Sequence, residues 1–261
     1  MIPYPKINPV IVKIGPFQVR WYGMMYLLGF LLGYLLLKKV VRDRGMEISS
    51  RELEGPLEAV VLGVILGGRL GYVFFYNLPY YLEHPLEILA FWHGGMSFHG
   101  GLLGTLMAGY IYCKRAGLDF WKMADSVVVV VPIGLGLGRL GNFINGELYG
   151  RVTSLPWGMV FPGAGPLPRH PSQIYEFLLE GVLLFAILWS LRRRPWPEGS
   201  LLAIFLLLYG VFRIFVEFFR QPDPQLGFVV DHITMGQVLS SGMVLVGLLI
   251  FLTRHLHRNH L

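Results

Sequence analysis

The sequence predicts an all-α membrane protein, a bundle of seven transmembrane helices, and three observations support this class. The 261 residues are 54% hydrophobic and only 15% charged, whereas soluble domains carry about 25% charged residues. Seven separate apolar stretches are each long enough to cross a bilayer as a tilted helix. The single cysteine, Cys113, excludes an intrachain disulfide. Disordered chains and disulfide-stapled secreted folds are therefore excluded.

The predicted spans leave no room for a large soluble domain, so residues 1–261 are expected to form one integral membrane domain. The spans are 17–37, 56–77, 94–113, 124–144, 173–191, 199–219 and 232–253. Several contain Gly, Arg, Asn or Glu, which is typical of helices around a polar cavity. The longest connection, about 145–172, contains five prolines. Because irregular backbone belongs outside the hydrocarbon, this connection is predicted to be an ordered loop or a small cap.

The distribution of positive charge predicts the orientation. Thirteen Lys and Arg residues follow the first, third, fifth and seventh spans, six lie on the other side, and three lie inside spans. By the positive-inside rule, the amino terminus lies outside and the carboxyl terminus in the cytoplasm. This pattern accounts for the net charge of +6, and no basic run alternates with aromatic residues as in nucleic-acid-binding proteins.

Charged residues inside the spans are candidates for a functional site, since an arginine at the centre of a span costs about 2.5–3.5 kcal/mol. Arg69, Arg139 and Arg213 each lie about 20 Å from the inner edge at 1.5 Å per helical residue. That depth is the outer third of a hydrocarbon core of about 30 Å. The same layer is predicted to receive polar groups from three further spans: Tyr22, His99, Gln173 and Glu176.

One face of the span 199–219 is polar. Its members are four residues at i, i+4, i+8 and i+11: Tyr209, Arg213, Glu217 and Arg220. One interpretation is an internal ion pair between Arg213 and Glu217, with Arg220 extending to the membrane surface. The other is a functional role, which the depth of Arg213 favours.

The span 124–144 places polar side chains among small ones. Arg139 and Asn142 lie one turn apart on one face and together could hold a phosphate. Its glycines at 136, 138 and 141 match GxGxxG, but no strand precedes them, which argues against a dinucleotide fold. Close helix packing explains some of these glycines but not the arginine.

Histidines offer weaker signals. His99 lies next to glycines at the start of a span, and a structural role and a functional role both remain open. His170 could be catalytic, but a role for Ser172 as the cap of the following helix is the favoured interpretation there. The tail histidines have no carboxylate or cysteine partners in the sequence, so no metal site is expected.

These residues occur in segments that resemble the signature of the bacterial prolipoprotein diacylglyceryl transferases. The central segment is GRLGNFINGELYG at 138–150. The supporting segments are RWYG at 20–23, GGRLGY at 67–72, SFHGG at 97–101, RHPSQIYE at 169–176, YGVFR at 209–213 and FFRQPD at 218–223.

The resemblance implies a seven-span enzyme of the bacterial plasma (inner) membrane, with a periplasmic amino terminus, a cytoplasmic carboxyl terminus, a small periplasmic cap and an active site on the periplasmic side. Such an enzyme moves diacylglyceryl from phosphatidylglycerol to the lipobox cysteine thiol of a prolipoprotein. A thioether forms and glycerol phosphate leaves. The expected partners are phosphatidylglycerol and lipobox peptides, with no cofactor, no metal and no nucleic acid.

The resemblance also implies roles for individual residues. The catalytic residues are His99, Arg139 and Arg213. The substrate-binding residues are Tyr22, Arg139, Asn142, Glu147, Gly150, Tyr209, Glu217 and Arg220. Fixed guanidinium groups suit a leaving phosphate, and the attacking thiol must lose its proton. His99 is the candidate base, although arginines that lower the pKa of the thiol could make a base unnecessary.

A transporter for an anionic solute is the alternative function, because arginines inside a bundle also line permeation paths. Alternating access needs polar groups in both halves of the bundle. The cytoplasmic half of the predicted spans is mainly Leu, Val, Ile and Phe, which argues against transport.

Overall fold

The computed structural model describes residues 2–90, 95–222, 228–230 and 233–258. The described chain forms two compact units, one made of Met1–Gly45 with Ala124–Leu261 and the other of Met46–Met123. It is mostly helical, as predicted. The predicted starts at 94 and 232 lie outside the described residues.

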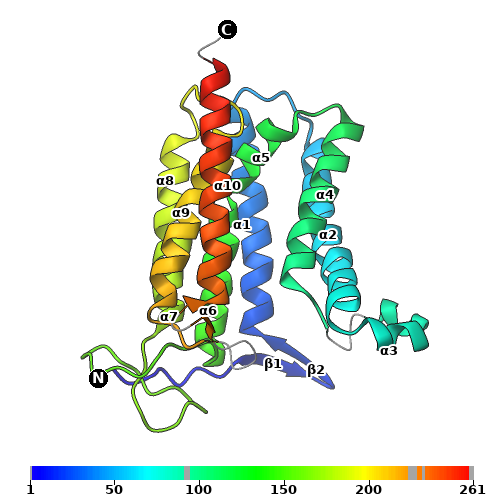
Figure 1. The fold of residues 1–261 in the computed structure, drawn as a ribbon. Coiled ribbons are helices and arrows are strands. Elements are labelled where there is room, and N and C mark those ends of the chain that lie inside the picture. Colours follow the sequence, from blue (N-terminus) through cyan, green and yellow to red (C-terminus); the bar gives the residue numbers. More distant parts are fainter. Residues whose placement is uncertain (1, 91–94, 223–227, 231–232, 259–261) are drawn as a thin grey trace. The chain divides into compact units, whose positions relative to one another are not determined.

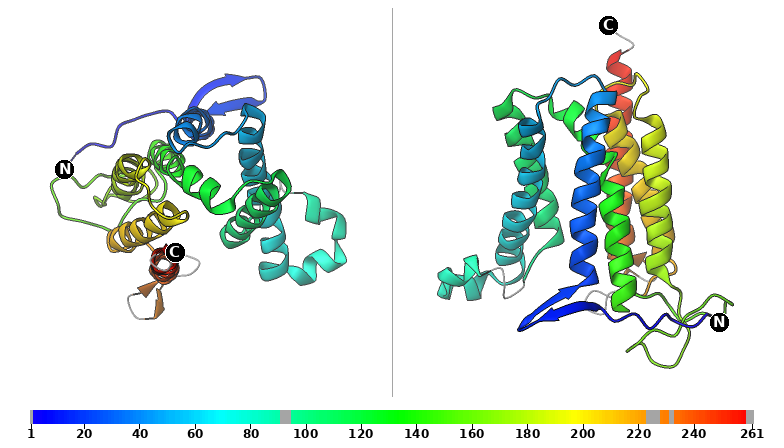
Figure 2. Two further views of the ribbon diagram at one scale, coloured as in Figure 1. Left: turned by 90° about the horizontal axis from the view of Figure 1, so that it is seen from above. Right: turned by 180° about the vertical axis from the view of Figure 1, so that it is seen from behind.

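The first unit is a set of helices that run alongside one another (Figures 1 and 2). Its main contacts join α9 to α10, α1 to α6, and α6 to the segment η3. The unit boundary at Ala124 falls within α5. The helical segments of this unit, with the whole of α5 included, are α1 (Trp21–Asp43), α5 (Phe120–Val128), α6 (Val131–Asn145), α7 (Ser172–Glu176), η3 (Phe177–Leu183), α8 (Leu184–Leu191), α9 (Ser200–Glu217) and α10 (Met235–Arg258).

Six helices of the described chain are long and apolar enough to cross a membrane. They correspond to six of the predicted spans: Trp21–Asp43, Glu52–Phe74, Phe120–Asn145, Ser172–Leu191, Ser200–Glu217 and Met235–Leu256. The remaining predicted span, 94–113, corresponds to α4 (Phe98–Ala116), a helix of 19 residues. The chain is therefore a multi-pass membrane protein.

Two of the predicted spans are less regular than expected. Pro132 has no N–H to donate to the carbonyl four residues earlier, and the fourth span divides there into α5 and α6. The fifth span is α-helical at both ends but π-helical over Phe177–Leu183. Short π-helical stretches inside α-helices frequently lie at functional sites.

Glycines bring α6 and η3 into backbone contact. A Cβ atom placed on Gly181 would lie 2.8 Å from the Cα of Gly136, and one placed on Gly136 would lie 3.1 Å from the Cα of Gly181. On the other side of α6, a Cβ on Gly29 would lie 3.2 Å from the Cα of Gly134. Only glycine permits these approaches, so helix packing accounts for part of the glycine-rich pattern.

A buried carboxylate organises the end of this unit where α9 begins. Asp125 accepts hydrogen bonds from the backbone N–H groups of Gly199 (3.0 Å) and Leu202 (2.9 Å), and from Arg44 (3.1 Å). It therefore satisfies the first turn of α9, whose orphan N–H groups need acceptors. This polar group in the otherwise apolar half of the predicted spans is explained by helix capping.

The second unit contains α2 (Ser50–Tyr76), α3 (Leu78–Glu83), a 3-10 turn η1 (Pro85–Leu89) and α4. Helices α2 and α4 lie side by side (Figure 1) and are antiparallel. Their glycines meet backbone to backbone, since a Cβ on Gly67 would lie 2.3 Å from the carbonyl oxygen of Gly100. Ser49 and Glu52 form a reciprocal capping box at the start of α2.

Arg69 holds the segment that precedes α4. Its guanidinium donates to the carbonyl oxygens of Glu87 (2.6 Å), Ile88 (2.9 Å) and Gly95 (3.2 Å), and it lies over the ring of Tyr81. This buried arginine thus fixes backbone in its own unit. Its predicted depth equals that of Arg139 and Arg213, but these contacts are with the backbone and a tyrosine ring of its own unit.

The connection 146–171 is an ordered loop, as predicted from its prolines. It begins after Asn145, the last residue of α6, and ends at α7. Isolated β-bridges pair Val152 and Met159 with Arg169, and Gly150 with Arg220. Two small hairpins complete the described chain: β1 (Val10–Ile14) with β2 (Phe17–Arg20), and β3 (Phe228–Val230) with β4 (Ile233–Thr234).

Candidate functional site: a buried arginine–glutamate cluster

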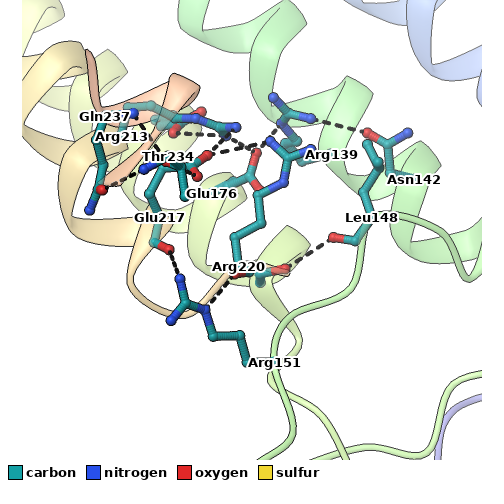
Figure 3. A network of polar contacts seen from close by, with 12 residues as sticks. Arg139, Asn142, Leu148, Arg151, Glu176, Arg213, Glu217, Arg220, Thr234 and Gln237 are labelled. Atoms are coloured by element: carbon teal, nitrogen blue, oxygen red, sulfur yellow. Dashed lines mark hydrogen bonds and ion pairs between the residues drawn. The ribbon is translucent and has the colours of Figure 1, made fainter. Parts of the chain in front are cut away.

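A cluster of charged side chains is buried inside the first unit (Figure 3). At its centre, one oxygen of Glu176, Oε2, contacts both Arg139 Nε (2.5 Å) and Arg213 Nη1 (2.8 Å). The Glu176 side chain is fully buried, whereas that of Arg139 is 20% exposed. The arginine–glutamate cluster consists of Arg139, Glu176, Glu180, Arg213, Glu217 and Arg220.

Arg213 is surrounded by carboxylates. Besides Glu176, its Nη2 contacts Glu217 Oε1 at 2.7 Å, and its Nη1 lies 3.7 Å from Glu180 Oε1. Thr234 Oγ1 donates to the other oxygen of Glu217 at 2.8 Å. The predicted internal pair of Arg213 and Glu217 is confirmed, and it is one part of a larger network.

Arg220 belongs to the same network rather than extending to the membrane surface. It is buried, and its Nη1 lies 3.6 Å from Glu217 Oε1. Its backbone carbonyl accepts a hydrogen bond from Arg151 Nε at 2.9 Å. The interpretation in which Arg220 extends to the surface is therefore wrong, because the loop 146–171 covers it with polar partners.

Asn142 connects the cluster to the loop after α6. Its Oδ1 accepts a long hydrogen bond from Arg139 Nη1 (3.4 Å), and its Nδ2 donates to Glu147 Oε1 (2.9 Å). Asn145 Nδ2 donates to the same glutamate oxygen at 3.1 Å. Arg139 and Asn142 thus lie on one face of α6, as the sequence predicts, and Glu147 is held beside them.

The loop just after Glu147 has a constrained backbone. Leu148 has φ +58°, in the left-handed region that is unfavourable for a branched side chain. Gln173 Nε2 donates to the carbonyl of Glu147 (2.6 Å), and Ser172 Oγ donates to the carbonyl of Leu148 (3.0 Å). Backbone strain of this kind persists where the surroundings hold it, often beside functional sites.

Two predictions in this region have different outcomes. Ser172 is not the cap of α7, because the cap position is Pro171 and Ser172 bonds the loop instead. Gly150 lies where no larger residue fits, since a Cβ there would lie 2.5 Å from the carbonyl oxygen of Phe219. Its predicted importance therefore has a steric basis.

The two predicted tyrosines lie at the edges of the cluster. Tyr22, on α1, contacts Gly141, and its hydroxyl interacts with Tyr26 (3.1 Å) and with Asn142. Tyr209, on α9, stacks on Phe205 and interacts electrostatically with Glu180.

His99 lies in the first turn of α4, in the second unit. Its side chain is outside the described part of the structure, so its role as a base stays a prediction. His170 lies in the loop 146–171, where its Nδ1 is 3.1 Å from the hydroxyl of Tyr175. Burial lowers the pKa of His170 below its ordinary value.

Sequence reasoning did not assign roles to the two glutamates that face the arginines from the fifth span. Glu176 is predicted in the same layer as the arginines but not among the site residues, and Glu180 is not among the predicted polar groups. A signal was present, because two acidic residues four positions apart in an apolar span are costly unless they face cations. The charge of Arg139 and Arg213 makes these glutamates their expected partners.

Together, the fold and the cluster define an integral membrane protein with an internal polar site in which guanidinium groups from separate helices hold an anion. Among the described residues, no group of three or more His, Cys, Asp or Glu could hold a metal ion. Comparison with known proteins gives the family. The sequence profile described as "Prolipoprotein diacylglyceryl transferase" matches residues 9–253, and the chain belongs to this family.

Several relatives are similar over nearly the whole chain, and each is named phosphatidylglycerol–prolipoprotein diacylglyceryl transferase. The relative from Desulfotalea psychrophila is 57% identical over 96% of this chain and 94% of its own length. The one from Vibrio vulnificus is 53% identical over 95% and 91%, respectively. The one from Geobacter sulfurreducens is 51% identical over 94% of both chains.

Proposed function

We propose that the arginine–glutamate cluster binds the phosphate of phosphatidylglycerol while its diacylglyceryl group moves to the cysteine thiol of a prolipoprotein. The family supplies the reaction, diacylglyceryl transfer to a prolipoprotein, and the names of the relatives supply the lipid donor. The roles of the individual residues in this reaction are proposed from the geometry of the cluster.

The observation that carries the proposal is the meeting of Arg139 and Arg213 on one oxygen of Glu176. These guanidinium groups come from α6 and α9, and they converge where a single anionic oxygen fits. A phosphate oxygen has the same charge and the same capacity to accept two charge-assisted hydrogen bonds. A lipid phosphate can therefore bind the same two arginines alongside Glu176, which stays in the cluster.

The proposed chemistry uses this convergence. The thiolate sulfur forms a bond to the carbon of the diacylglyceryl group that carries the phosphate oxygen. The bond between that carbon and that oxygen breaks. Negative charge develops on the departing glycerol phosphate, where fixed guanidinium groups stabilise it. The thiol proton leaves before or during attack, and His99 is the candidate acceptor. Tyr22, Asn142, Glu147, Gly150, Tyr209, Glu217 and Arg220 are proposed to shape and bind the substrate site.

The orientation is part of the same proposal. The whole chain, 1–261, is proposed to act as one transferase domain of the bacterial inner membrane, with α4 as a seventh span. The amino terminus and the loop 146–171 lie on the periplasmic side, where lipobox cysteines are reached. The excess of positive charge on the opposite side supports this orientation.

The direct test is an assay of the purified protein with phosphatidylglycerol and a lipobox peptide, with the diacylglyceryl thioether detected by mass spectrometry. Arg139→Ala is expected to abolish the product while the protein still inserts. The matched control is Arg194→Ala, which removes an exposed arginine after α8 and should keep full activity. Full activity of Arg139→Ala would refute the phosphate role.

A further inference from the structure

Glu180 is a buried carboxylate that the proposed chemistry does not use. It lies in the π-helical segment η3, and its side chain is fully buried. Among the described residues, neither of its oxygens has a hydrogen-bond partner. Its closest charge contact is Arg213 Nη1 at 3.7 Å, which is too long for a hydrogen bond. A buried polar group without a partner is costly and needs an explanation.

The groups around Glu180 come from every helix that packs on η3 near it. Arg213 and Tyr209 face it from α9, Glu176 from α7 and Arg139 from α6, and Arg220 acts on it from beyond the end of α9. The arginine–glutamate cluster holds three arginines and three glutamates. With every group ionised, the cluster is electrically neutral.

An anionic substrate disturbs this balance. A phosphodiester headgroup adds one negative charge to a buried cluster that has no cation to spare. An uncompensated charge in a site of low dielectric constant is strongly unfavourable. Binding becomes favourable if one carboxylate of the cluster takes up a proton when the phosphate enters.

The hydrogen bonds of the cluster indicate which carboxylate can take up a proton at the smallest cost. Glu176 and Glu217 each contact an arginine nitrogen within 2.8 Å, and protonation would weaken those contacts. Glu180 has no such bond to lose. When protonated, Glu180 gains a donor. Glu176, whose Oε2 contacts the same Arg213 nitrogen, has in Oε1 a buried oxygen that lacks a hydrogen-bond partner among the described residues.

We propose that Glu180 is a positioning residue that takes up one proton as the lipid phosphate binds and releases it when glycerol phosphate leaves. The proposal rests on the proposed phosphate role of the cluster. Glu180 touches no substrate. Once protonated, Glu180 no longer attracts Arg213 by its charge, so the guanidinium can bind the phosphate. The added proton also keeps the filled site neutral.

The first test uses the unmodified protein. Binding of short-chain phosphatidylglycerol is measured by titration calorimetry in two buffers that differ in ionisation enthalpy. The headgroup phosphodiester stays a monoanion, so it does not itself take up a proton. About one proton per bound lipid is expected, because a single carboxyl compensates a single added charge. Uptake of no proton would overturn the proposal.

The second test assigns the proton to Glu180. Glu180→Gln imitates the protonated carboxyl, so it should bind lipid without proton uptake. It should also lose the decrease in affinity, up to tenfold per pH unit, that is expected of the unmodified protein as the pH rises. Glu180→Asp should restore the pH dependence. A Glu180→Gln protein that inserts and binds lipid with unchanged proton uptake, or that inserts and binds no lipid, would contradict the proposal.

The two proposals fail in different ways. If Arg139→Ala binds short-chain phosphatidylglycerol as tightly as the unmodified protein, the phosphate role itself is wrong. If Arg139→Ala loses binding and Glu180→Gln keeps the proton uptake, only the role of Glu180 is wrong.

Discussion

At the scale of single residues, the site depends on buried charges that stabilise one another. Removing one member of a buried ion pair leaves its partner uncompensated and typically costs about 3–5 kcal/mol. One oxygen of Glu176 forms ion pairs with both Arg139 and Arg213. Loss of Glu176 would therefore leave both arginines without that partner and lower the stability of the fold. A phosphate that binds these arginines adds a negative charge to the pairs already present, so that charge needs compensation as well.

His170 gives a pH-dependent stability that can be measured. Burial lowers the pKa of its imidazole, so the folded protein favours the neutral form. Its contribution is therefore present above about pH 6.5, the ordinary value for histidine, and is lost as the pH falls through the lowered pKa of the folded state. The decrease in Tm of the detergent-solubilised protein between neutral and mildly acidic pH should be smaller in His170→Gln. The control is exposed His84→Gln, which should leave that decrease unchanged, and an equal decrease in all three proteins would contradict the prediction.

Several site residues could be predicted because their chemistry is visible along one helix. Arg139 and Asn142 are one turn apart on α6, and Arg213 and Glu217 are one turn apart on α9. The central role of Glu176 could not be predicted in the same way, because it depends on three helices meeting at one atom. The buried position of Arg220 also depends on the fold, since residues far away in the sequence cover it.

At the scale of elements, the cluster depends on how closely α6 approaches the fifth span. Gly136 and Gly181 let the two backbones touch. Gly136 is three residues before Arg139 on α6, and Gly181 directly follows Glu180 in the fifth span. The glycine pattern of α6 predicted close packing. It could not show which glycine faces which helix.

Gly181→Ala tests this contact with the smallest possible change. The added Cβ would lie 2.8 Å from the Cα of Gly136, so one helix must shift. Such overpacking typically costs about 1–3 kcal/mol. We expect a lower Tm and a large loss of transferase activity, because Glu176 and Glu180 move relative to Arg139.

The matched control is Gly134→Ala on α6, where an added Cβ meets no atom within 4 Å. Both changes replace glycine with a better helix former. A difference in Tm or activity between the two variants therefore measures the effect of the contact between α6 and η3. Equal Tm and activity in the two variants would show that the approach of α6 to η3 does not matter.

The irregular shapes of the fourth and fifth spans could be predicted only in part. The break before α6 follows from Pro132 and was in principle predictable, because proline cannot donate the hydrogen bond that the helix requires. The π-helical turn of η3 has no such local cause in the residues Phe177–Leu183. It arises where the span packs against α6, so it is a property of the assembled unit.

At the scale of the whole molecule, the sequence predicted the class and the approximate ends of the spans, because a bilayer demands long apolar helices. Six described helices meet that demand. The proposed seventh, α4, has 19 residues and carries Lys114 and Arg115 in its last turn. The division into two compact units could not be predicted, since nothing in composition separates residues 46–123 from the rest.

The proposed orientation predicts which loops an impermeant reagent reaches in intact cells. In a Cys113→Ser background, Ser154→Cys in the loop 146–171 should react with an impermeant maleimide from outside. Residues 154 and 198 are both exposed, and only residue 154 is proposed to be periplasmic. Glu198→Cys, in the connection before α9, should react only after the inner membrane is permeabilised. Labelling of the cysteine at 198 in intact cells would reverse the orientation.

The equal number of positive and negative groups in the cluster also constrains how the protein assembles. Arg139 of α6, Glu176 of α7 and Glu180 of η3 have their charge partners on other elements, whereas Arg213 of α9 also pairs with Glu217 of its own helix. The charges of the cluster therefore cancel only when α6, α7, η3 and α9 are together. Packing of these segments and construction of the site are thus coupled. A variant in which the helices no longer pack together should therefore lose lipid binding and cooperative melting together, whereas Arg139→Ala should lose binding while it still inserts.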